Sequence, residues 1–233
     1  MKSSNINLAM IKTVAEHIGD LREAFVFLGG ASTCLLITDT AAPEIRPTLD
    51  VDIIVEVASR LEYHKLEEML RQLGFRQSTE PEDPICRWVV EEVKVDVMPT
   101  NEDILGFSNK WYSQAIEKSN VVEIEANLKI RMVTAPYFLA TKIEAFYGRG
   151  KKDFLASHDM EDIITVIDGR QEIIKEIYAS SSDLRAYLSD QFQDFLTNEL
   201  FIESLSAHLL PDKASQARVP ILLERIREIA GMV

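Results

Sequence analysis

The chain has 233 residues, of which 46% are hydrophobic, and its formal net charge at pH 7 is −13. This length and composition are enough to bury the core of one or two domains, so we expect a globular protein. The negative charge argues against broad, non-specific binding to nucleic acid, which is a polyanion. No apolar stretch is long enough to span a bilayer, and charged residues interrupt the N-terminal helical pattern, which does not resemble a signal peptide.

The two cysteines, Cys34 and Cys86, lie in apolar surroundings and lack the close spacing of a zinc site or redox motif. We therefore expect both to be buried free thiols in a cytoplasmic protein. The four histidines are scattered along the chain, so a histidine-based metal site is not expected.

Basic residues gather in one segment of this acidic chain. Residues 129–152 contain a single acidic residue, Glu144, and six basic ones, namely Lys129, Arg131, Lys142, Arg149, Lys151 and Lys152. The segment is either a solvated helix end and loop or an anion-binding surface, and composition alone favours neither.

The first half of the chain alternates between predicted helices and strands. In chain order the pattern predicts a helix to about residue 24, a strand at 25–28, a helix at 31–38, a loop at 39–47, a strand at 50–57 and a helix at 59–74. Ser59 and Glu62 form a capping box for the last helix, and Gly74 ends it. Strands at 86–91 and 93–99 follow as a tight hairpin, and a further strand pair is expected within 121–133.

From residue 134 onward the pattern is helical. Apolar residues recur at spacings of three and four in the segments 135–149, 159–170, 171–192 and 214–233. We therefore predict an α+β protein in which a mixed sheet with flanking helices, residues 1–133, is followed by a helical bundle, residues 134–233.

Three aspartates lie on predicted strands. Asp50 and Asp52 alternate in "RPTLDVDIIVEV" and therefore point to the same face of their strand. Asp96 lies in "VKVDVMP", on the side opposite to the valines. If these strands pair, three carboxylates converge as ligands for magnesium, which prefers hard oxygen donors. A chance Asp-x-Asp pair and a solvent-facing hairpin aspartate are the alternatives.

Gly29 and Gly30 join a predicted strand to a predicted helix. Missing side chains and free backbone N–H groups at such a junction suit a triphosphate, although a Gly-Gly turn is common by chance.

Taken in order, "FLGGAS", "TLDVDIIV" and "VKVDVMP" resemble the nucleotidyltransferase fold of the DNA polymerase beta superfamily. Its pattern is a strand, a Gly-Gly or Gly-Ser turn, a helix, an Asp-x-Asp strand and a later strand with a third carboxylate. The chain further resembles the AbiEii-like branch, whose Arg-x-Thr-x-Asp-x-Asp run is matched by Arg46, Thr48, Asp50 and Asp52. The branch's later helices are matched by "LATKIEAFYGRG" and "SHDMEDII", with Lys142, Arg149, Asp159 and Asp162.

The resemblance implies a nucleotidyltransferase catalytic domain over 1–133 and a helical domain over 134–233 that closes the active-site cleft. It implies Mg²⁺ or Mn²⁺ held by Asp50, Asp52 and Asp96, which with Lys142 would be the catalytic residues. The implied nucleotide-binding residues are Gly29, Gly30, Ser32, Thr48, Arg149, Asp159 and Asp162. Ser32 is included because Gly30 stands where many members have a serine.

Lys142 is expected to neutralise triphosphate charge from a helix facing the carboxylates, so its removal should impair transfer with little change in melting temperature. Arg149 is expected to assist as a bidentate phosphate clamp. Asp159 and Asp162 either orient Lys142 or are acids favoured at a helix N-terminus by the dipole.

The resemblance implies transfer of a nucleoside monophosphate from a nucleoside triphosphate, with no membrane partner. The acceptor stays open between tRNA, as for the toxin of a toxin–antitoxin pair with an antitoxin partner, and a protein or a small molecule. Two other functions are considered. Three intact aspartates argue against a degenerate nucleotide-binding module, and the Gly-Gly turn and chain order argue against a magnesium phosphohydrolase.

Overall fold

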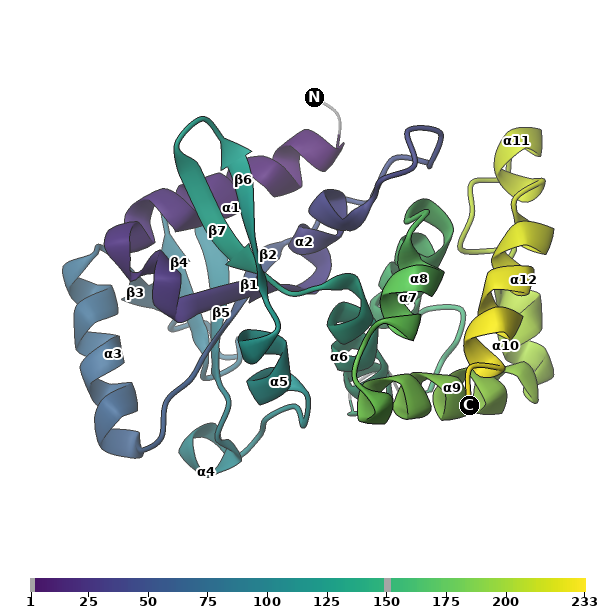
Figure 1. Ribbon diagram of the computed structural model, residues 1–233. Coiled ribbons are helices and arrows are strands. Elements are labelled where there is room, and N and C mark those ends of the chain that lie inside the picture. Colours follow the sequence, from purple (N-terminus) through teal and green to yellow (C-terminus); the bar gives the residue numbers. More distant parts are fainter. Residues whose placement is uncertain (1–2, 149–151) are drawn as a thin grey trace. The chain divides into compact units, whose positions relative to one another are not determined.

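The computed structural model describes residues 3–148 and 152–233 (Figure 1). The chain separates into two compact units. The first unit comprises the residues up to Leu35 together with Arg46–Thr134, and the second comprises Leu36–Ile45 together with Ala135–Val233. Within the described ranges, no helix is both long and apolar enough to cross a membrane.

In the described part of the chain, the first unit is built on a seven-stranded sheet with the order β3-β4-β5-β2-β1-β7-β6. The strands are β1 (Phe25–Leu28), β2 (Asp50–Val55), β3 (Arg76–Gln77), β4 (Arg87–Val90), β5 (Val93–Pro99), β6 (Asn120–Glu125) and β7 (Leu128–Met132). Strand β2 runs antiparallel to β1 and parallel to β5, and β1 runs parallel to β7. The predicted α+β class with a mixed sheet is confirmed.

Helices of the first unit pack on this sheet (Figure 1). They are α1 (Ser3–Ile18), the 3-10 helix η1 (Gly19–Ala24), α2 (Gly29–Leu36), α3 (Arg60–Gln72), α4 (Glu102–Leu105) and α5 (Tyr112–Glu117). Apolar side chains of α1 and α3 share one hydrophobic core with Val51 and Ile53 of β2 and Val95 and Val97 of β5. Because strand residues alternate between faces, the residue between Val51 and Ile53 and the residue between Val95 and Val97 point to the other face of the sheet.

The predicted hairpin between β4 and β5 turns at two residues, Glu91 and Glu92. Both have positive φ values, 43° and 68°, as a two-residue turn of the primed type requires. Val90 therefore pairs with Val93, and each step outward brings further partners together, ending with Arg87 opposite Asp96. The turn thus fixes which side chains of β4 lie beside the third aspartate.

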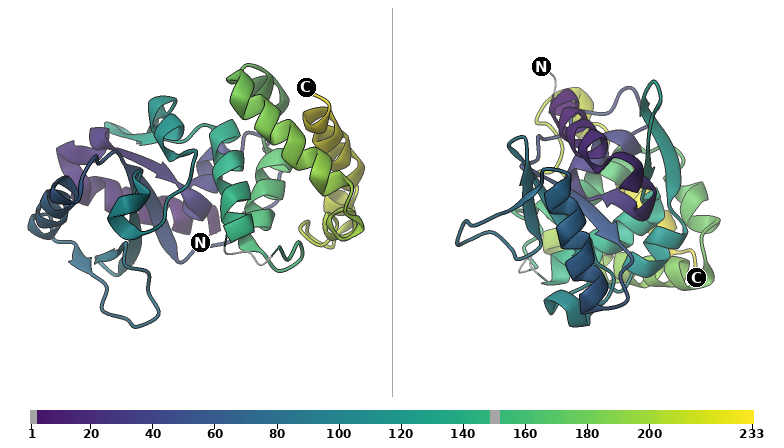
Figure 2. Two further views of the ribbon diagram at one scale, coloured as in Figure 1. Left: turned by 90° about the horizontal axis from the view of Figure 1, so that it is seen from below. Right: turned by 90° about the vertical axis from the view of Figure 1, so that its left-hand side faces the viewer.

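The second unit is helical. Its helices are α6 (Ala135–Gly148), α7 (His158–Gly169), α8 (Ile173–Tyr178), α9 (Ser182–Leu196), α10 (Glu199–Ser204), α11 (Lys213–Gln216) and α12 (Val219–Ala230). Helix α6 lies alongside α7, and α9 lies alongside α12 (Figure 2). Phe146 of α6 packs with Phe154 and Phe195, whose ring centroids lie 5.1 and 5.9 Å from its own. The helical bundle expected from the spacing of apolar residues is present.

The segment Leu36–Ile45 belongs to the second unit, although the sequence pattern placed it in the first domain. The Asp39 amide donates to the Gly169 carbonyl at 2.9 Å. Arg218 joins the segment to α7, since Nη2 donates to Asp39 Oδ2 at 2.7 Å and Nε donates to Asp168 Oδ2 at 2.8 Å. The segment between helix α2 and strand β2 thus belongs to the helical unit, which the sequence pattern alone did not indicate.

Replacing Arg218 with alanine should lower the free energy of unfolding by about 3–5 kcal/mol, because Asp168 would be left buried without its partner. Urea denaturation of the full chain measures this change. The matched control is Arg185→Ala, which removes an exposed guanidinium that donates to the Tyr178 carbonyl and should cost less than about 1 kcal/mol. Equal losses in the two variants would contradict the tethering role of Arg218.

Candidate active site

Three aspartates lie side by side on the sheet of the first unit. Parallel pairing of β2 with β5 puts Asp52 beside Asp96 and Asp50 beside Lys94. Asp50 and Asp52 share a face because they alternate, and Asp96 shares it because it is in register with Asp52. This face is opposite to the one that contributes to the hydrophobic core. The common face expected from the sequence alternation is therefore present, whereas the convergence of the three carboxylates on one cation and their roles stay predictions.

The guanidinium of Arg87 lies between two of these carboxylates. Its Nε and Nη2 donate to Asp96 Oδ1 and Oδ2, each at 2.8 Å, and Nη2 also donates to Asp50 Oδ2 at 2.5 Å. The Arg87 side chain is 14% exposed and that of Asp96 is 9% exposed. The hydrogen bonds to Asp96 raise the pKa of Arg87 further above its ordinary value, so the guanidinium stays charged.

Asp83 extends the cluster away from the sheet. Its Oδ1 accepts from Arg87 Nη1 at 3.2 Å, and both of its oxygens accept from Lys94 Nζ at 3.0 Å. The Ser78 hydroxyl donates to Asp83 Oδ2 at 2.7 Å. These bonds, first from Ser78 and then from Lys94, lower the pKa of Asp83, which therefore stays ionised.

The ion pairs of this cluster join three carboxylates, those of Asp50, Asp83 and Asp96, to two cationic groups, those of Arg87 and Lys94. Arg87 contacts all three carboxylates and therefore lies at the centre of the network.

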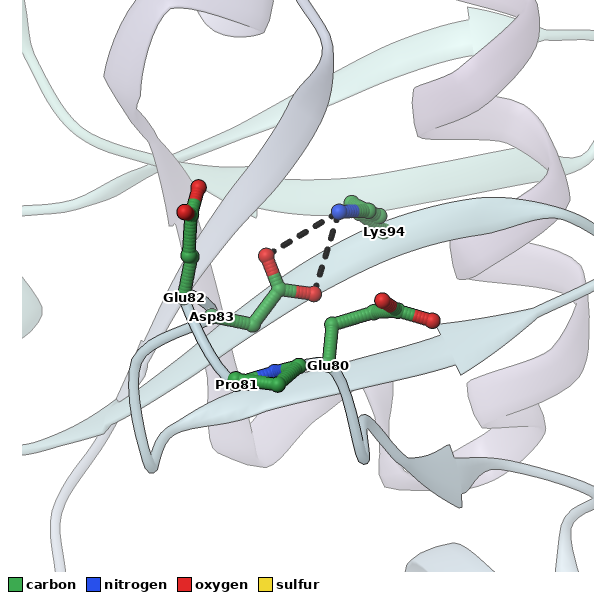
Figure 3. Close-up of a pocket in the computed structure, with 5 residues that line it drawn as sticks. All are labelled: Glu80, Pro81, Glu82, Asp83 and Lys94. Carbon is green, nitrogen blue, oxygen red and sulfur yellow. Dashed lines mark hydrogen bonds and ion pairs between the residues drawn. The ribbon is translucent and has the colours of Figure 1, made fainter.

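A hollow of about 590 Å³ adjoins Asp83 and Lys94. Figure 3 shows its lining, in which the Asp83 carboxylate is directed at the Lys94 ammonium. The remaining lining residues are Glu80, Pro81 and Glu82. Three carboxylates against one ammonium make this hollow acidic, like the cluster beside it.

Gly29 gives Asp52 room at the start of α2. Leu28, the last residue of β1, pairs with Asp52, so the Asp52 side chain lies next to the turn that follows. Gly29 has a φ of +75°, and a Cβ at this position would overlap the Asp52 carboxylate. A glycine is therefore required here both for its backbone conformation and for its lack of a side chain.

Ser32 does not present its hydroxyl to a ligand. The residue is fully buried, and Oγ donates to the Leu28 carbonyl at 2.8 Å. The prediction that Ser32 contacts phosphate in place of a serine at Gly30 is therefore not supported. Its hydroxyl instead ties the first turn of α2 to the end of β1.

Thr48 also has internal partners, which position the start of β2. Its Oγ1 donates to the Asp50 carbonyl at 3.1 Å, and its amide donates to Asn7 Oδ1 at 3.0 Å. Asn7, which is fully buried on α1, donates from Nδ2 to the Arg46 carbonyl at 3.0 Å. The structure thus gives Thr48 a role in positioning Asp50, while its predicted contact with nucleotide stays a prediction.

In the second unit, Lys142 is bonded to both aspartates of the Asp-x-x-Asp helix. Lys142 Nζ lies 2.9 Å from Asp159 Oδ1 and 2.7 Å from Asp162 Oδ2. All three side chains are less than a tenth exposed. These contacts argue against the expectation that Lys142 can be removed with little change in melting temperature, because removal would take a buried cation away from two buried carboxylates. Arg149, the predicted phosphate clamp, lies outside the described residues.

Four residues of this site were not predicted from the sequence, namely Arg87, Asp83, Lys94 and Asn7. Arg87 carried a usable signal, because an arginine on a strand of the predicted hairpin must have a cross-strand partner, and a two-residue turn makes that partner Asp96. Asp83 lies in a loop and Asn7 on a distant helix, so no spacing rule connects either residue to the aspartates.

Aspartate oxygens are the hard donors that a divalent cation prefers, but the described residues do not include three acidic, histidine or cysteine side chains arranged about one metal position. Carboxylate oxygens of Asp50 and Asp96 converge on a single cationic group, the guanidinium of Arg87. Asp52 is in register with Asp96 and adds a third hard donor. In this structure the cation between Asp50 and Asp96 is therefore the Arg87 guanidinium.

The sequence matches no family model and no curated protein. Among solved structures, an antigenic nucleotidyltransferase-like protein from Paracoccidioides brasiliensis is similar, with a TM-score of 0.52 and 20% identity over 87% of this chain and 93% of that chain. JHP933 from Helicobacter pylori has a TM-score of 0.49 and 12% identity over 100% of this chain and 90% of that chain. The similarity to the Paracoccidioides brasiliensis protein shows the fold alone. This chain has the fold of a nucleotidyltransferase-like protein.

Replacing Gly29 with alanine should destabilise the protein more than the same change at Gly19. Both glycines have positive φ, +75° and +59°, but a Cβ at Gly19 would meet nothing within 4 Å. Each variant should lose about 1–2 kcal/mol from its backbone, and Gly29→Ala should lose about 1–3 kcal/mol more from the overlap with Asp52. Chemical denaturation measures both, and equal losses would mean that Asp52 moves aside freely.

Replacing Lys142 with alanine should lower the free energy of unfolding by about 3–5 kcal/mol, since it removes a buried ammonium that is bonded to the buried carboxylates of Asp159 and Asp162. Lys118→Ala is the control, because Lys118 is an exposed lysine paired with the exposed Glu117 and should cost about 0.5 kcal/mol or less. Thermal and urea unfolding of both variants checks the difference. A Lys142→Ala variant as stable as Lys118→Ala would argue that the buried ion pairs do not persist in solution.

Proposed function

We propose that this protein is a metal-dependent nucleotidyltransferase that transfers a nucleoside monophosphate from a nucleoside triphosphate to an acceptor and releases pyrophosphate. One observation carries the proposal: Asp50, Asp52 and Asp96 share one face of the sheet, beside the Gly29 turn that begins α2. The fold shared with a nucleotidyltransferase-like protein supports the same reading.

In this proposal Asp50, Asp52 and Asp96 would hold Mg²⁺ or Mn²⁺. A bound divalent cation stabilises charge on phosphate oxygens and lowers the pKa of an attacking hydroxyl. The acceptor oxygen bonds to the α-phosphorus while the bond from that phosphorus to the pyrophosphate oxygen breaks, and Asp96 takes the hydroxyl proton. Backbone N–H groups where Gly29 and Gly30 begin α2 bind the triphosphate.

The proposal gives Lys142 a more restricted role than the sequence implied. Its ammonium is buried against Asp159 and Asp162, so it can neutralise phosphate only by exchanging one of these carboxylates for a phosphate oxygen. In the absence of such an exchange, Asp159 and Asp162 act on Lys142 and not on the nucleotide. Arg149 keeps its proposed role as a phosphate clamp on the motif alone.

The acceptor and the setting are proposed from the sequence. The run Arg46, Thr48, Asp50 and Asp52 supports an AbiEii-like enzyme, and hence a toxin of a toxin–antitoxin pair that modifies tRNA. The net charge of −13 supports a protein or small-molecule acceptor instead. Both cysteines are free thiols, and burial raises the pKa of Cys34 to about 11 and that of Cys86 to about 12, which fits an unreactive pair in the cytoplasm.

Arg87 favours a second candidate function. If its guanidinium neutralises Asp50 and Asp96 permanently, no metal can bind there, and the protein is a nucleotide-binding module without transfer activity. This candidate predicts nucleotide binding that does not depend on magnesium.

A transfer assay with nucleoside triphosphates labelled at the α-phosphate tests the proposal against tRNA, protein and small-molecule acceptors. Asp52→Asn should reduce label transfer at least about a hundredfold, roughly 2.7 kcal/mol, while the protein stays folded, and chelation of divalent metal should abolish transfer. The control Asp20→Asn removes an exposed carboxylate of η1 and should transfer at the parent rate.

Three results would contradict the proposal in different ways. Transfer by Asp52→Asn at the parent rate would remove the carboxylates from the mechanism. Magnesium-independent nucleotide binding without label on any acceptor would favour the binding module. Release of free nucleoside monophosphate as the sole product would indicate a phosphohydrolase.

A further inference from the structure

We infer that Arg87 is an internal counter-cation that competes with the divalent metal for Asp50 and Asp96, so that metal binds only when the guanidinium leaves them. The inference rests on the proposed metal site and adds a residue that controls occupancy of that site.

The geometry makes the two cations mutually exclusive. Arg87 donates two hydrogen bonds to Asp96 and one to Asp50. Three of the four carboxylate oxygens of these two aspartates are therefore bonded to it. Mg²⁺ would need the same oxygens at about 2.0–2.1 Å. A guanidinium at 2.5–2.8 Å from those oxygens leaves no room for that ion and would repel it.

Charge explains why the guanidinium is held there. Without a cation, Asp50, Asp52 and Asp96 would be like charges on adjacent positions of a largely buried sheet face. Arg87 reduces that repulsion through a fork that matches carboxylate geometry. A doubly charged ion at the same place would reduce it further, so the metal-bound state does not need Arg87.

Asp83 gives the displaced guanidinium a place to go. Its carboxylate already accepts from Arg87 Nη1 at 3.2 Å, whereas Asp50 and Asp96 accept from Nε and Nη2. Asp83 also lines the acidic hollow, together with Lys94 (Figure 3). Asp83 therefore keeps Arg87 charged and partnered in both positions.

Competition of this kind lowers the apparent metal affinity of the native protein. When the binding-competent arrangement is a minority state, the apparent Kd rises in proportion to the rarity of that state. Removing Arg87 should therefore tighten metal binding, which is the opposite of what loss of a supporting residue would do.

The test is Mn²⁺ binding to the full chain, followed by the paramagnetic resonance signal of free Mn²⁺ and by calorimetry. Arg87→Gln should bind Mn²⁺ at least about tenfold more tightly than the parent, a change of about 1.4 kcal/mol. Its melting temperature without metal should fall, and Mn²⁺ should raise it more than it raises that of the parent. An Arg87→Gln protein that binds Mn²⁺ with the parent affinity, or more weakly, would overturn the inference.

The matched control is Arg71→Gln, which removes one guanidinium charge from the same unit without touching the aspartates. Arg71 lies over the Trp88 ring, 5.3 Å from its centroid, and pairs with Glu67. Its Mn²⁺ affinity should match that of the parent within about twofold, because long-range charge is largely screened at ordinary salt. A tenfold gain in this control as well would assign the effect to net charge and overturn the competition.

A second readout uses the parent protein and does not depend on the variant folding. The Arg87 Nε–H resonance of the ¹⁵N-labelled chain, identified by its loss in Arg87→Lys, should move toward that of a solvent-exposed arginine when Mg²⁺ saturates the site. An unchanged resonance at saturating Mg²⁺ would overturn the inference.

The same measurements separate failure of the inference from failure of the proposed function. If the parent binds Mn²⁺, Asp52→Asn does not, and Arg87→Gln binds no more tightly than the parent, then the competition alone is wrong. If neither the parent nor Arg87→Gln binds Mn²⁺, then the proposed metal site is wrong and the competition with it.

Discussion

Crowding of like charges on one sheet face is the constraint around which the first unit is arranged. Asp50 and Asp52 project from one strand and Asp96 from the next, so their carboxylates cannot avoid one another. In a largely buried setting such a group needs a cation, and in the described structure Arg87 supplies it with a fork across two of the carboxylates. Repulsion retained at the site is of use to a protein that binds a metal, because the free energy of relieving it adds to metal affinity.

Two turns fix this arrangement. The hairpin residues Glu91 and Glu92 set the register that carries Arg87 to Asp96, and a longer or shorter turn would place a different residue of β4 there. At the other edge of the cluster, Gly29 has no side chain, so the Asp52 carboxylate can lie against the start of α2. The carboxylates are thus positioned by backbone geometry on both sides.

Much of this arrangement was predictable from sequence, and the rest depended on contacts that carry no sequence period. Alternation in the strands that bear Asp50 and Asp96 predicted their common face, and helical spacing after residue 134 predicted the bundle. The sequence named the aspartates near Lys142 but did not predict that Lys142 is buried. Its helix is apolar on nearly every side, so little of the helix is left to solvent. The place of Leu36–Ile45 in the second unit rests on bonds to residues far away in sequence, such as that of Arg218 to Asp39.

Each unit has one basic side chain bonded to two carboxylates. The two networks differ in whether another cation can replace that side chain. Asp159 and Asp162 are 6% and 2% exposed, and Lys142 has lost nearly all contact with water, so opening that pair would strand buried charges. Asp50 is 29% exposed and Arg87 has Asp83 as a further acceptor, whereas Asp96 is 9% exposed, so this network can open when another cation takes the place of Arg87 at Asp96. The lysine network is therefore suited to holding two helices together, and the arginine network is suited to giving way to a ligand of higher charge.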